Sequence, residues 1–294
     1  MTFEEYKKVK ALNNSGIKLL LRSPLHYWHE YLNPNKVVEP PSRALVIGTL
    51  LHDFVFLGEQ NFCLEPNINK RTKQGKLDWA QWQEDNPNLT PLKEEELANI
   101  MGMFHSLTAG GGYVLKPDDI TTDCEVDVFW KINTDNRIEP VDCKARLDTC
   151  TYYEIEDGSE RVTITDLKTT NDASFEGMHK AINNYDYYRQ AAWYILGVGE
   201  KYEIECEDFE DLCTKVTFRF VFVEKKPPYA MNCTEIGFRS LEQGLRECIN
   251  AANIYAQCTL RDRWPAYNIE NGFYTDLATW KMDSIHKQHV FNRD

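Results

Sequence analysis

The first part of the chain spaces its apolar residues with a helical period. Ser15 can cap a helix that carries the apolar residues from Ile17 to Leu21, and Pro24 starts a second short helical segment. Residues 43–57 are strongly apolar and predict a buried helix that carries His52. Residues 66–91 are polar and contain several prolines, so they predict an irregular excursion.

The middle of the chain changes to the pattern of β-strands. An amphipathic helix is predicted over residues 93–107, and the glycines at 110–112 are predicted to form a turn. Three runs rich in β-branched and alternating apolar residues follow, and short turn sequences separate them. The predicted strands are Cys124–Ile132, Val141–Tyr153 and Arg161–Thr169, with turn residues Asp135-Asn136 and Asp157-Gly158 between them. Such short connections predict an antiparallel meander.

The last third returns to helical spacing. The predicted elements are a helix over Phe175–Leu196, a strand over Lys215–Val223, a helix over Ile236–Tyr255 and an irregular tail from Arg261. Strands flanked by helices on both sides along the chain indicate a mixed α/β fold. A length of 294 residues suits one domain, with a core over about residues 14–225 and a C-terminal helix and tail over 226–294.

Charge and composition narrow the class of protein. The chain has 33 basic and 46 acidic residues, a net charge of −13, which argues against a protein that coats nucleic acid without specificity. Lys70, Arg71, Lys73 and Lys76 form a local basic cluster, either a DNA contact or a solvated loop. No run is apolar enough for a bilayer, and the first residues lack an apolar signal region. We therefore expect a cytosolic protein without a membrane partner.

Nine cysteines are scattered along the chain, and none forms a C-x-x-C pair. An odd number without a framework spacing predicts reduced residues, most of them in the core. A zinc ribbon or a cysteine redox pair is unsupported.

The segment Asp166-Leu167-Lys168 carries the most informative chemistry. Asp166 and Lys168 project from the same face of a predicted strand, while Leu167 points the other way, into a core. Asp148 lies on the neighbouring predicted strand. Two carboxylates to hold a divalent cation and a lysine to orient a water are the minimum for metal-assisted phosphodiester cleavage. An acid and a lysine two residues apart are also common on solvated strand faces, so the motif depends on its context.

A second group lies on the predicted helix after Lys168. Gln190 and Tyr194 are four residues apart, so they share one helical face. Packing against the sheet would explain an aromatic residue on that face, but it explains a glutamine less readily.

Along the chain, an apolar helix with His52 is followed by Asp148, then by Asp166-Leu167-Lys168, and then by Gln190 and Tyr194. This order of segments resembles the PD-(D/E)xK nucleases, and specifically the RecE-type exonuclease VIII branch of phages and prophages. The matching segments are Gly48 to His52, Cys143 to Asp148, Asp166 to Thr170 and Gln190 to Tyr194, together with the opening Asn14 to Lys18. The resemblance covers about residues 14–200. It implies a restriction-endonuclease-like core, in which helices flank a central mixed sheet with an antiparallel meander.

The resemblance also implies a metal site. Asp148 and Asp166 would bind Mg²⁺ or Mn²⁺, and the Leu167 carbonyl would be a further ligand. His52 would complete or support this site, although a lone histidine in an apolar helix is also a common core residue. Glu125 is a possible additional acid, and an exposed strand carboxylate explains it equally well.

The remaining implied roles concern the reaction and the substrate. Lys168 would position the attacking water and stabilise the charge that develops on the phosphate. Gln190 and Tyr194 would brace the site or contact the DNA backbone.

The register of the first acid has one alternative. Asp166 lies 18 residues after Asp148, a longer gap than is usual in this branch, and residues 152–160 are expected to extend the hairpin. If Asp142 were the first acid the register would change, since it shares a strand face with Asp148. The Arg-Leu-Asp ending of the segment favours Asp148.

By this resemblance the protein is a metal-dependent exodeoxyribonuclease that degrades linear double-stranded DNA from its ends, in the 5′→3′ direction, for phage-type recombination. A homo-oligomeric ring, a single-strand annealing partner and the cytosol of a bacterial host are further implications. One alternative is a related repair or CRISPR-adaptation nuclease, but Cys233, Cys248 and Cys258 are too dispersed to favour its iron–sulfur cluster. The other is an inactive DNA-binding or assembly module on the same fold, and the intact set of acids and lysine argues against it.

Overall fold

The computed structural model describes residues 1–109, 115, 121–134, 139–155 and 158–267. Its helices are α1 (Phe3–Lys8), α2 (Asn14–Arg22), α3 (Pro24–Tyr27), η1 (Trp28–Leu32), α4 (Arg43–His52), η2 (Asp53–Leu57), α5 (Lys73–Asp85), α6 (Glu94–Ala109), α8 (Phe175–Asn184), α9 (Tyr187–Lys201), α10 (Phe209–Lys215) and α11 (Phe238–Arg261). Its strands are β1 (Phe62–Leu64), β2 (Thr90–Leu92), β3 (Thr121–Ile132), β4 (Val141–Glu154), β5 (Glu160–Thr170), β6 (Val216–Glu224) and β7 (Met231–Glu235). The turns predicted at Gly110-Gly111-Gly112 and Asp135-Asn136, residue Asp157 and the tail beyond residue 267 lie outside the described residues.

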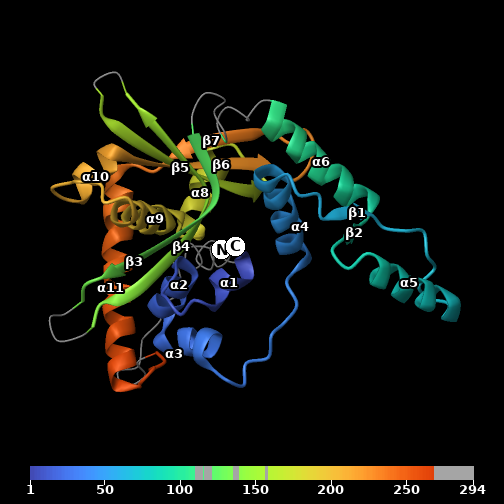
Figure 1. Cartoon of the computed structure of the whole chain (residues 1–294), viewed down its shortest axis with the longest axis horizontal. Coiled ribbons are helices and arrows are strands. Elements are labelled where there is room, and N and C mark those ends of the chain that lie inside the picture. The colour runs from blue at the N-terminus through green and yellow to red at the C-terminus, as the bar shows by residue number, and fades with distance from the viewer. Residues whose placement is uncertain (110–114, 116–120, 135–138, 156–157, 268–294) are drawn as a thin grey trace, which may run out of the picture.

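A five-stranded mixed sheet in the order β3-β4-β5-β6-β7 forms the centre of the molecule (Figure 1). The first three strands make the predicted antiparallel meander, and the β4–β5 hairpin stays paired as far as Glu154 with Glu160, which confirms its extension. Strands β5 and β6 are parallel. Parallel neighbours need a long crossover, and α8, α9 and α10 supply it. The mixed α/β fold expected from the sequence is confirmed.

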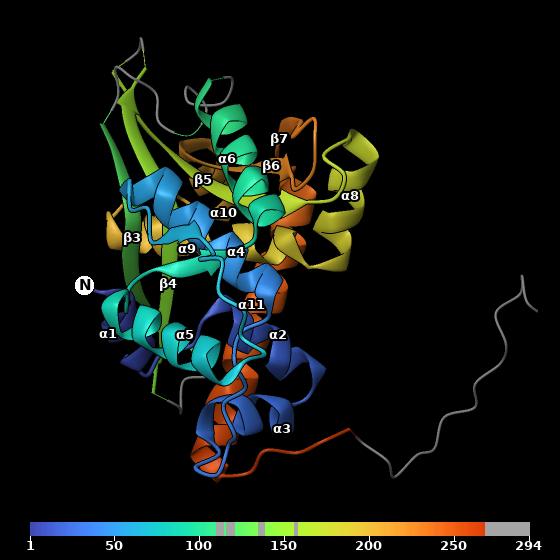
Figure 2. The ribbon, with the colours of Figure 1, turned by 90° about the vertical axis from the view of Figure 1, so that its right-hand side faces the viewer.

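Helices cover both faces of the sheet. On one face α9 and α11 pack over β3 to β6, where Phe218, Phe220 and Phe222 join the larger apolar core. On the opposite face Val221 and the predicted core residue Leu167 pack with residues of α4 and α6 (Figure 2). Because side chains alternate along β5 and β6, Asp166 and Lys168 lie on the face of the sheet that α9 covers.

Several helix boundaries differ from the sequence prediction; the last helix, for example, ends at Arg261 rather than at Tyr255. The first long helix is capped by Asn13, whose side chain accepts from the Gly16 N–H, and Ser15 lies inside its first turn. The helix predicted over residues 175–196 is divided into α8 and α9 at Asp186, whose backbone is left-handed with φ of 58°. Directly after this division, the ring centroid of Tyr187 in α9 lies 5.1 Å from that of Phe220 in β6.

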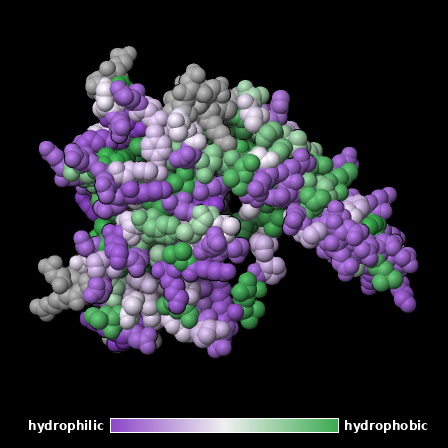
Figure 3. Space-filling view, in the orientation of Figure 1, coloured by the Kyte–Doolittle hydropathy of each residue, from purple (hydrophilic) through white to green (hydrophobic). Residues whose placement is uncertain are grey.

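Residues 66–91 contain an element that the sequence pattern did not predict. Helix α5 begins after the N-cap Thr72 and projects from the body of the molecule, and its surface is mainly hydrophilic (Figures 1 and 3). Trp79 and Trp82 stack with ring centroids 5.2 Å apart, and the Lys70 ammonium lies 3.3 Å from the Trp79 ring centroid. A helix stabilised by its cap and its own rings needs no apolar stripe facing a core, so the hydrophobic period was too weak to predict it.

The described residues include all nine cysteines, and each is a free thiol. Within the same residues, no helix combines the length and the apolar character that a membrane crossing requires.

Candidate metal centre

The site lies where β4 and β5 separate. Their ladder ends at Thr149 paired with Thr165, and the next pair in this register would be Asp148 with Asp166. Here the Leu167 N–H donates to Asp148 Oδ2 at 2.7 Å instead of to a strand carbonyl. A buried N–H needs a partner, so the acid side chain itself completes the backbone hydrogen bonding at the point of separation.

Asp166 is held from two sides. Its side chain is almost fully buried, and Oδ2 accepts from Gln190 Nε2 on α9 at 2.6 Å. Its Oδ1 forms an ion pair with the Lys168 ammonium, which is on the same strand face as predicted. The Lys168 ammonium also lies 5.0 Å from the ring centroid of Tyr187. The structure therefore brings the acid, the lysine and the glutamine into direct contact.

His52 ends α4 and faces the same point. Its Nε2 lies 3.1 Å from the Leu167 carbonyl oxygen, and its Nδ1 lies 3.5 Å from Asp148 Oδ2. The π-helical turn η2 follows at once, and such turns are frequent at functional sites. These contacts are polar, so His52 is not simply a packed core residue.

Glu125 comes from β3, opposite Asp148. The ladder pairs on either side of it are Cys124 with Thr149 and Val126 with Leu147, so no residue is inserted. Its backbone is nevertheless left-handed, with φ of 53°. This conformation costs a non-glycine residue of the order of 1–3 kcal/mol, and such strain is concentrated at functional sites.

One ligand atom each from His52, Glu125 and Asp148 lie within 4.8 Å of one another. Ligands on opposite sides of a cation at about 2.1 Å are about 4.2 Å apart, so this spacing suits a single ion. Carboxylate oxygens and an imidazole nitrogen are donors that Mg²⁺ and Mn²⁺ accept. Of the predicted ligands, His52, Asp148 and Leu167 come together, whereas Asp166 is adjacent to them and occupied by Lys168 and Gln190.

The charges at this centre oppose one another. The pKa of Asp148 is raised to about 6. Burial is the largest cause and the carboxylate of Asp166 acts in the same direction, while His52 and Lys168 partly oppose them. Burial by itself lowers the pKa of Lys168, but the carboxylates of Asp166 and Asp148 outweigh it, so its pKa lies above the usual value. Lys168 is therefore an ammonium at neutral pH, and Asp148 is a carboxyl whose ionisation a cation would favour.

Tyr194 is half-buried one turn beyond Gln190, with its ring centroid 5.8 Å from that of Phe218. Burial, and after it the charge of Asp166, raises the pKa of Tyr194 well above its usual value, so the phenol stays protonated. Tyr187, which the sequence reasoning missed, is three residues before Gln190 and lies beside Lys168. Helical spacing from Gln190 could have found it.

Asp142, the alternative first acid, does not reach the centre. Its side chain is exposed and pairs with Lys131 across the β3–β4 ladder at 3.2 Å. The acid that the structure places beside Asp166 is Asp148.

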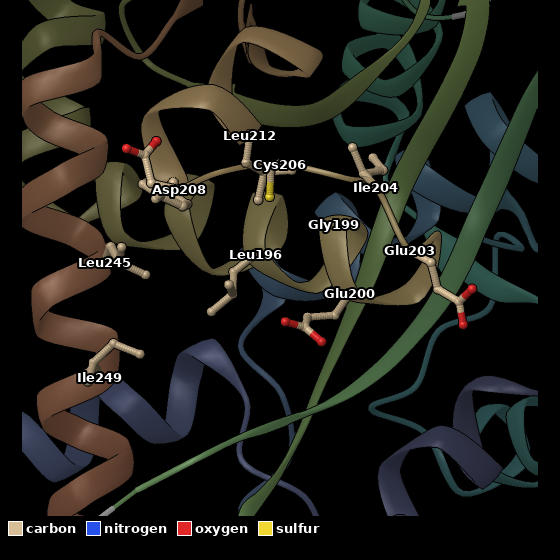
Figure 4. A pocket seen from close by; sticks show the side chains of 11 residues that line it. Leu196, Gly199, Glu200, Glu203, Ile204, Cys206, Asp208, Leu212, Leu245 and Ile249 are labelled. Atoms are coloured by element: carbon tan, nitrogen blue, oxygen red, sulfur yellow. The ribbon is translucent and has the colours of Figure 1, made fainter.

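Two hollows in the described part of the molecule lie away from this centre. One, of about 430 Å³, lies between α9, α10 and α11 and has an apolar floor with Leu196, Leu212 and Leu245 (Figure 4). Another, of about 760 Å³, is lined by the outer ends of β4 and β5. Neither of these two is lined by a residue of the metal centre.

Comparison with known families gives a match over most of the chain. A family described as "PDDEXK-like domain of unknown function (DUF3799)" matches residues 13–275. No curated protein matches the chain.

Comparison with solved structures gives the same architecture. The crystal structure of a protein named "Putative exonuclease", from Eubacterium rectale, is 14% identical, covers 96% of this chain and 97% of its own, and superimposes with a TM-score of 0.59. At this identity the likeness shows the fold. A second structure, that of SSO0001, is also 14% identical, covers 71% of this chain and 84% of its own, and has a TM-score of 0.30, too low to support an argument.

Proposed function

The chain belongs to the PDDEXK-like family DUF3799, and on that premise we propose that it is a divalent-metal-dependent exodeoxyribonuclease. The observation that carries this proposal is the convergence of His52, Glu125 and Asp148 within 4.8 Å, beside an Asp166–Lys168 pair. The exonuclease name given to the Eubacterium rectale protein supports the same class of activity.

Some of these residues would bind the metal ion, and others would stabilise charge or hold a neighbouring side chain in place. When bound, Mg²⁺ or Mn²⁺ would polarise the scissile phosphate and lower the pKa of a water. His52, Asp148 and the Leu167 carbonyl would hold the cation, with Asp166 and Glu125 as further acids. Lys168 stays charged, so it would orient the water and stabilise the developing negative charge rather than accept a proton. Gln190 would keep Asp166 in one rotamer by its 2.6 Å hydrogen bond.

We further propose that the substrate is linear double-stranded DNA, degraded 5′→3′ from its ends, with a ring of identical subunits and a single-strand annealing protein as partner in phage-type recombination. These finer points rest on the sequence resemblance. Sedimentation of the purified chain tests the ring, and duplexes labelled at either the 5′ or the 3′ end test the polarity.

The decisive experiment is digestion of an end-labelled linear duplex with Mg²⁺, with a closed circular duplex beside it. We expect the wild type to shorten only the linear DNA. Asp166→Asn, which keeps the size of the side chain, should lower the rate by at least about a hundredfold, as does removal of a group that acts in the transition state. Asp142→Asn is the matched control and should cut like the wild type, since Asp142 is an exposed acid on β4.

Other outcomes separate the alternatives. Cleavage of the closed circle would show an endonuclease, and a purified protein with iron–sulfur absorbance would favour the repair or CRISPR-adaptation class. If the wild type binds Mn²⁺ but cuts no DNA with any divalent metal, the inactive-module reading replaces this proposal.

A further inference from the structure

Arg146 joins the metal centre to the neighbouring strand. It lies on β4 two residues before Asp148, and its guanidinium binds two acids of β3. Its Nε donates to Glu125 Oε2 at 2.7 Å, and its Nη1 donates to Asp127 Oδ1 at 3.0 Å. The side chains of all three residues are largely buried, with 15%, 18% and 11% exposed for Arg146, Glu125 and Asp127. Such pairs are screened by solvent much less than exposed ones.

The guanidinium is itself held in place. Its Cζ lies 5.6 Å from the ring centroid of Phe3 and 5.9 Å from that of Tyr6, both on α1. In the strand ladder Arg146 is directly opposite Asp127, so its backbone position is also fixed. A planar fork that donates to two carboxylates at once is a geometry that arginine provides and lysine does not.

Without the positive charge of Arg146, the acids of this region would repel one another. Glu125 and Asp148 approach each other at the metal centre. The pKa of Asp53 is raised, mainly by burial and next by the charge of Glu125. Glu125 also has a left-handed backbone, so its own chain does not favour its position. Arg146 binds Oε2 of Glu125, and one oxygen of that carboxylate lies within 4.8 Å of the ligand atoms of His52 and Asp148.

We propose that Arg146 is a positioning residue that holds Glu125 against His52 and Asp148 and thereby completes a divalent-cation subsite from these three residues. The inference rests on the proposed metal-dependent function and adds to it a residue that touches neither the metal nor DNA. The two possible effects of Arg146 on cation affinity have opposite signs. If its positive charge acted only by repulsion, it would weaken cation binding, whereas a positioning residue strengthens cation binding.

The test is Mn²⁺ binding to the full chain without DNA, measured by titration calorimetry and by the loss of the free-Mn²⁺ signal in electron paramagnetic resonance. We expect Arg146→Gln to weaken binding about 10- to 100-fold, the range for residues that orient metal ligands. Arg146→Lys should recover part of the loss, because an ammonium can replace one of the two contacts. Arg219→Gln is the matched control, because Arg219 bridges β6 to Glu235 of β7 in a similar cross-strand ion pair and should leave Mn²⁺ affinity unchanged.

A double-mutant cycle separates positioning from a general effect. If Arg146 acts through Glu125, the losses of Arg146→Gln and Glu125→Gln will not add in the double variant. Asp127→Asn removes the negative charge of the second partner of Arg146 and leaves Arg146 itself charged. It should weaken binding in the same direction by a smaller factor, and it provides the test should Arg146→Gln fail to fold.

Unchanged or tighter Mn²⁺ binding by folded Arg146→Gln would overturn the inference and leave the proposed nuclease untouched, and so would additive losses in the cycle. A wild type that binds no Mn²⁺ would overturn both.

Discussion

At the residue scale, the candidate site depends on buried carboxyls held together at a cost. Asp148 lies where burial disfavours its ionised form, and Asp166 adds a second charge beside it. The partners that offset this cost come from three elements: α4, β5 and α9. Stability and function therefore oppose each other here, and a cation would relieve the conflict.

The first prediction concerns the pH dependence of stability without metal. The folded pKa of Asp148, about 6, exceeds its unfolded value near 3.8, so between these values the folded state keeps a proton that the unfolded state releases. Linkage then lowers the free energy of unfolding as pH rises through this window, by up to about 1.4 kcal/mol per pH unit. Urea unfolding of wild type and Asp148→Asn at pH 4, 5, 6 and 7.5 measures the effect.

The difference between these two proteins reports Asp148 together with the groups that titrate with it, because all more distant titrating groups are shared. Asp148→Asn should become the more stable of the two as pH rises, with most of the change complete just above pH 6. A constant difference across the series would show that Asp148 ionises normally in the folded protein. Added Mg²⁺ should stabilise the wild type at pH 7.5 and have little effect on the variant.

At the element scale, the close approach of α9 and α11 fixes the helix that supplies Gln190. A Cβ added at Gly244 of α11 would lie 2.7 Å from the Tyr188 carbonyl oxygen and 2.9 Å from the Arg189 Cα. Both atoms belong to the backbone of α9, directly before Gln190. Glu247 of α11 also accepts hydrogen bonds from the side chains of Tyr188 and Arg189 of α9. The position of the Asp166 partner is thus set by helix packing.

The second prediction follows from this packing. Gly244→Ala should push the two helices apart and lower the free energy of unfolding by about 1–3 kcal/mol, the usual cost of overpacking. Gly48→Ala is the matched control, since nothing described lies within 4 Å of its added Cβ on α4, and alanine should stabilise that helix by up to about 1 kcal/mol. Urea unfolding measures both, and equal effects in the two variants would contradict the argument.

At the scale of the whole molecule, an acidic chain must find DNA through local positive charge. The projecting helix α5 and the loop before it carry Arg71, Lys73 and Lys76, all exposed. Within the described part of the chain, none of the three has an ion-pair partner. Lys70, by contrast, pairs with Glu65 and covers Trp79. If these three side chains bind phosphates, the position of α5 outside the body makes them the first contact for a duplex.

The third prediction is the salt dependence of DNA binding, with Asp166→Asn as the background so that no DNA is cut. Neutralising Arg71, Lys73 and Lys76 to glutamine should lower the slope of log affinity against log salt by up to about 2.7, since each phosphate contact contributes about 0.9. Arg239, Arg246 and Arg261 on the exposed side of α11 form the matched control set, with the same change of charge. Equal slopes in the two triple variants would show that α5 does not contact phosphate.

The sequence alone determined features that depend on strand alternation and local spacing. The meander, the common face of Asp166 and Lys168, the core position of Leu167 and the shared helical face of Gln190 and Tyr194 all follow from periods of two and 3.6 residues, and the structure has them. The sequence also identified His52 and Glu125 as candidates, but not whether they approach the acids.

Only the tertiary structure decided the features that depend on residues far apart in the chain. The separation of β4 from β5 beyond Thr149, the left-handed backbone of Glu125, the Arg146 contacts and the division between α8 and α9 have no local period. Each is maintained by partners from other elements, which supply the hydrogen bonds and counter-charges that the local chain lacks. The local sequence pattern does not predict such partners, because these hydrogen bonds and ion pairs form only when distant segments pack together.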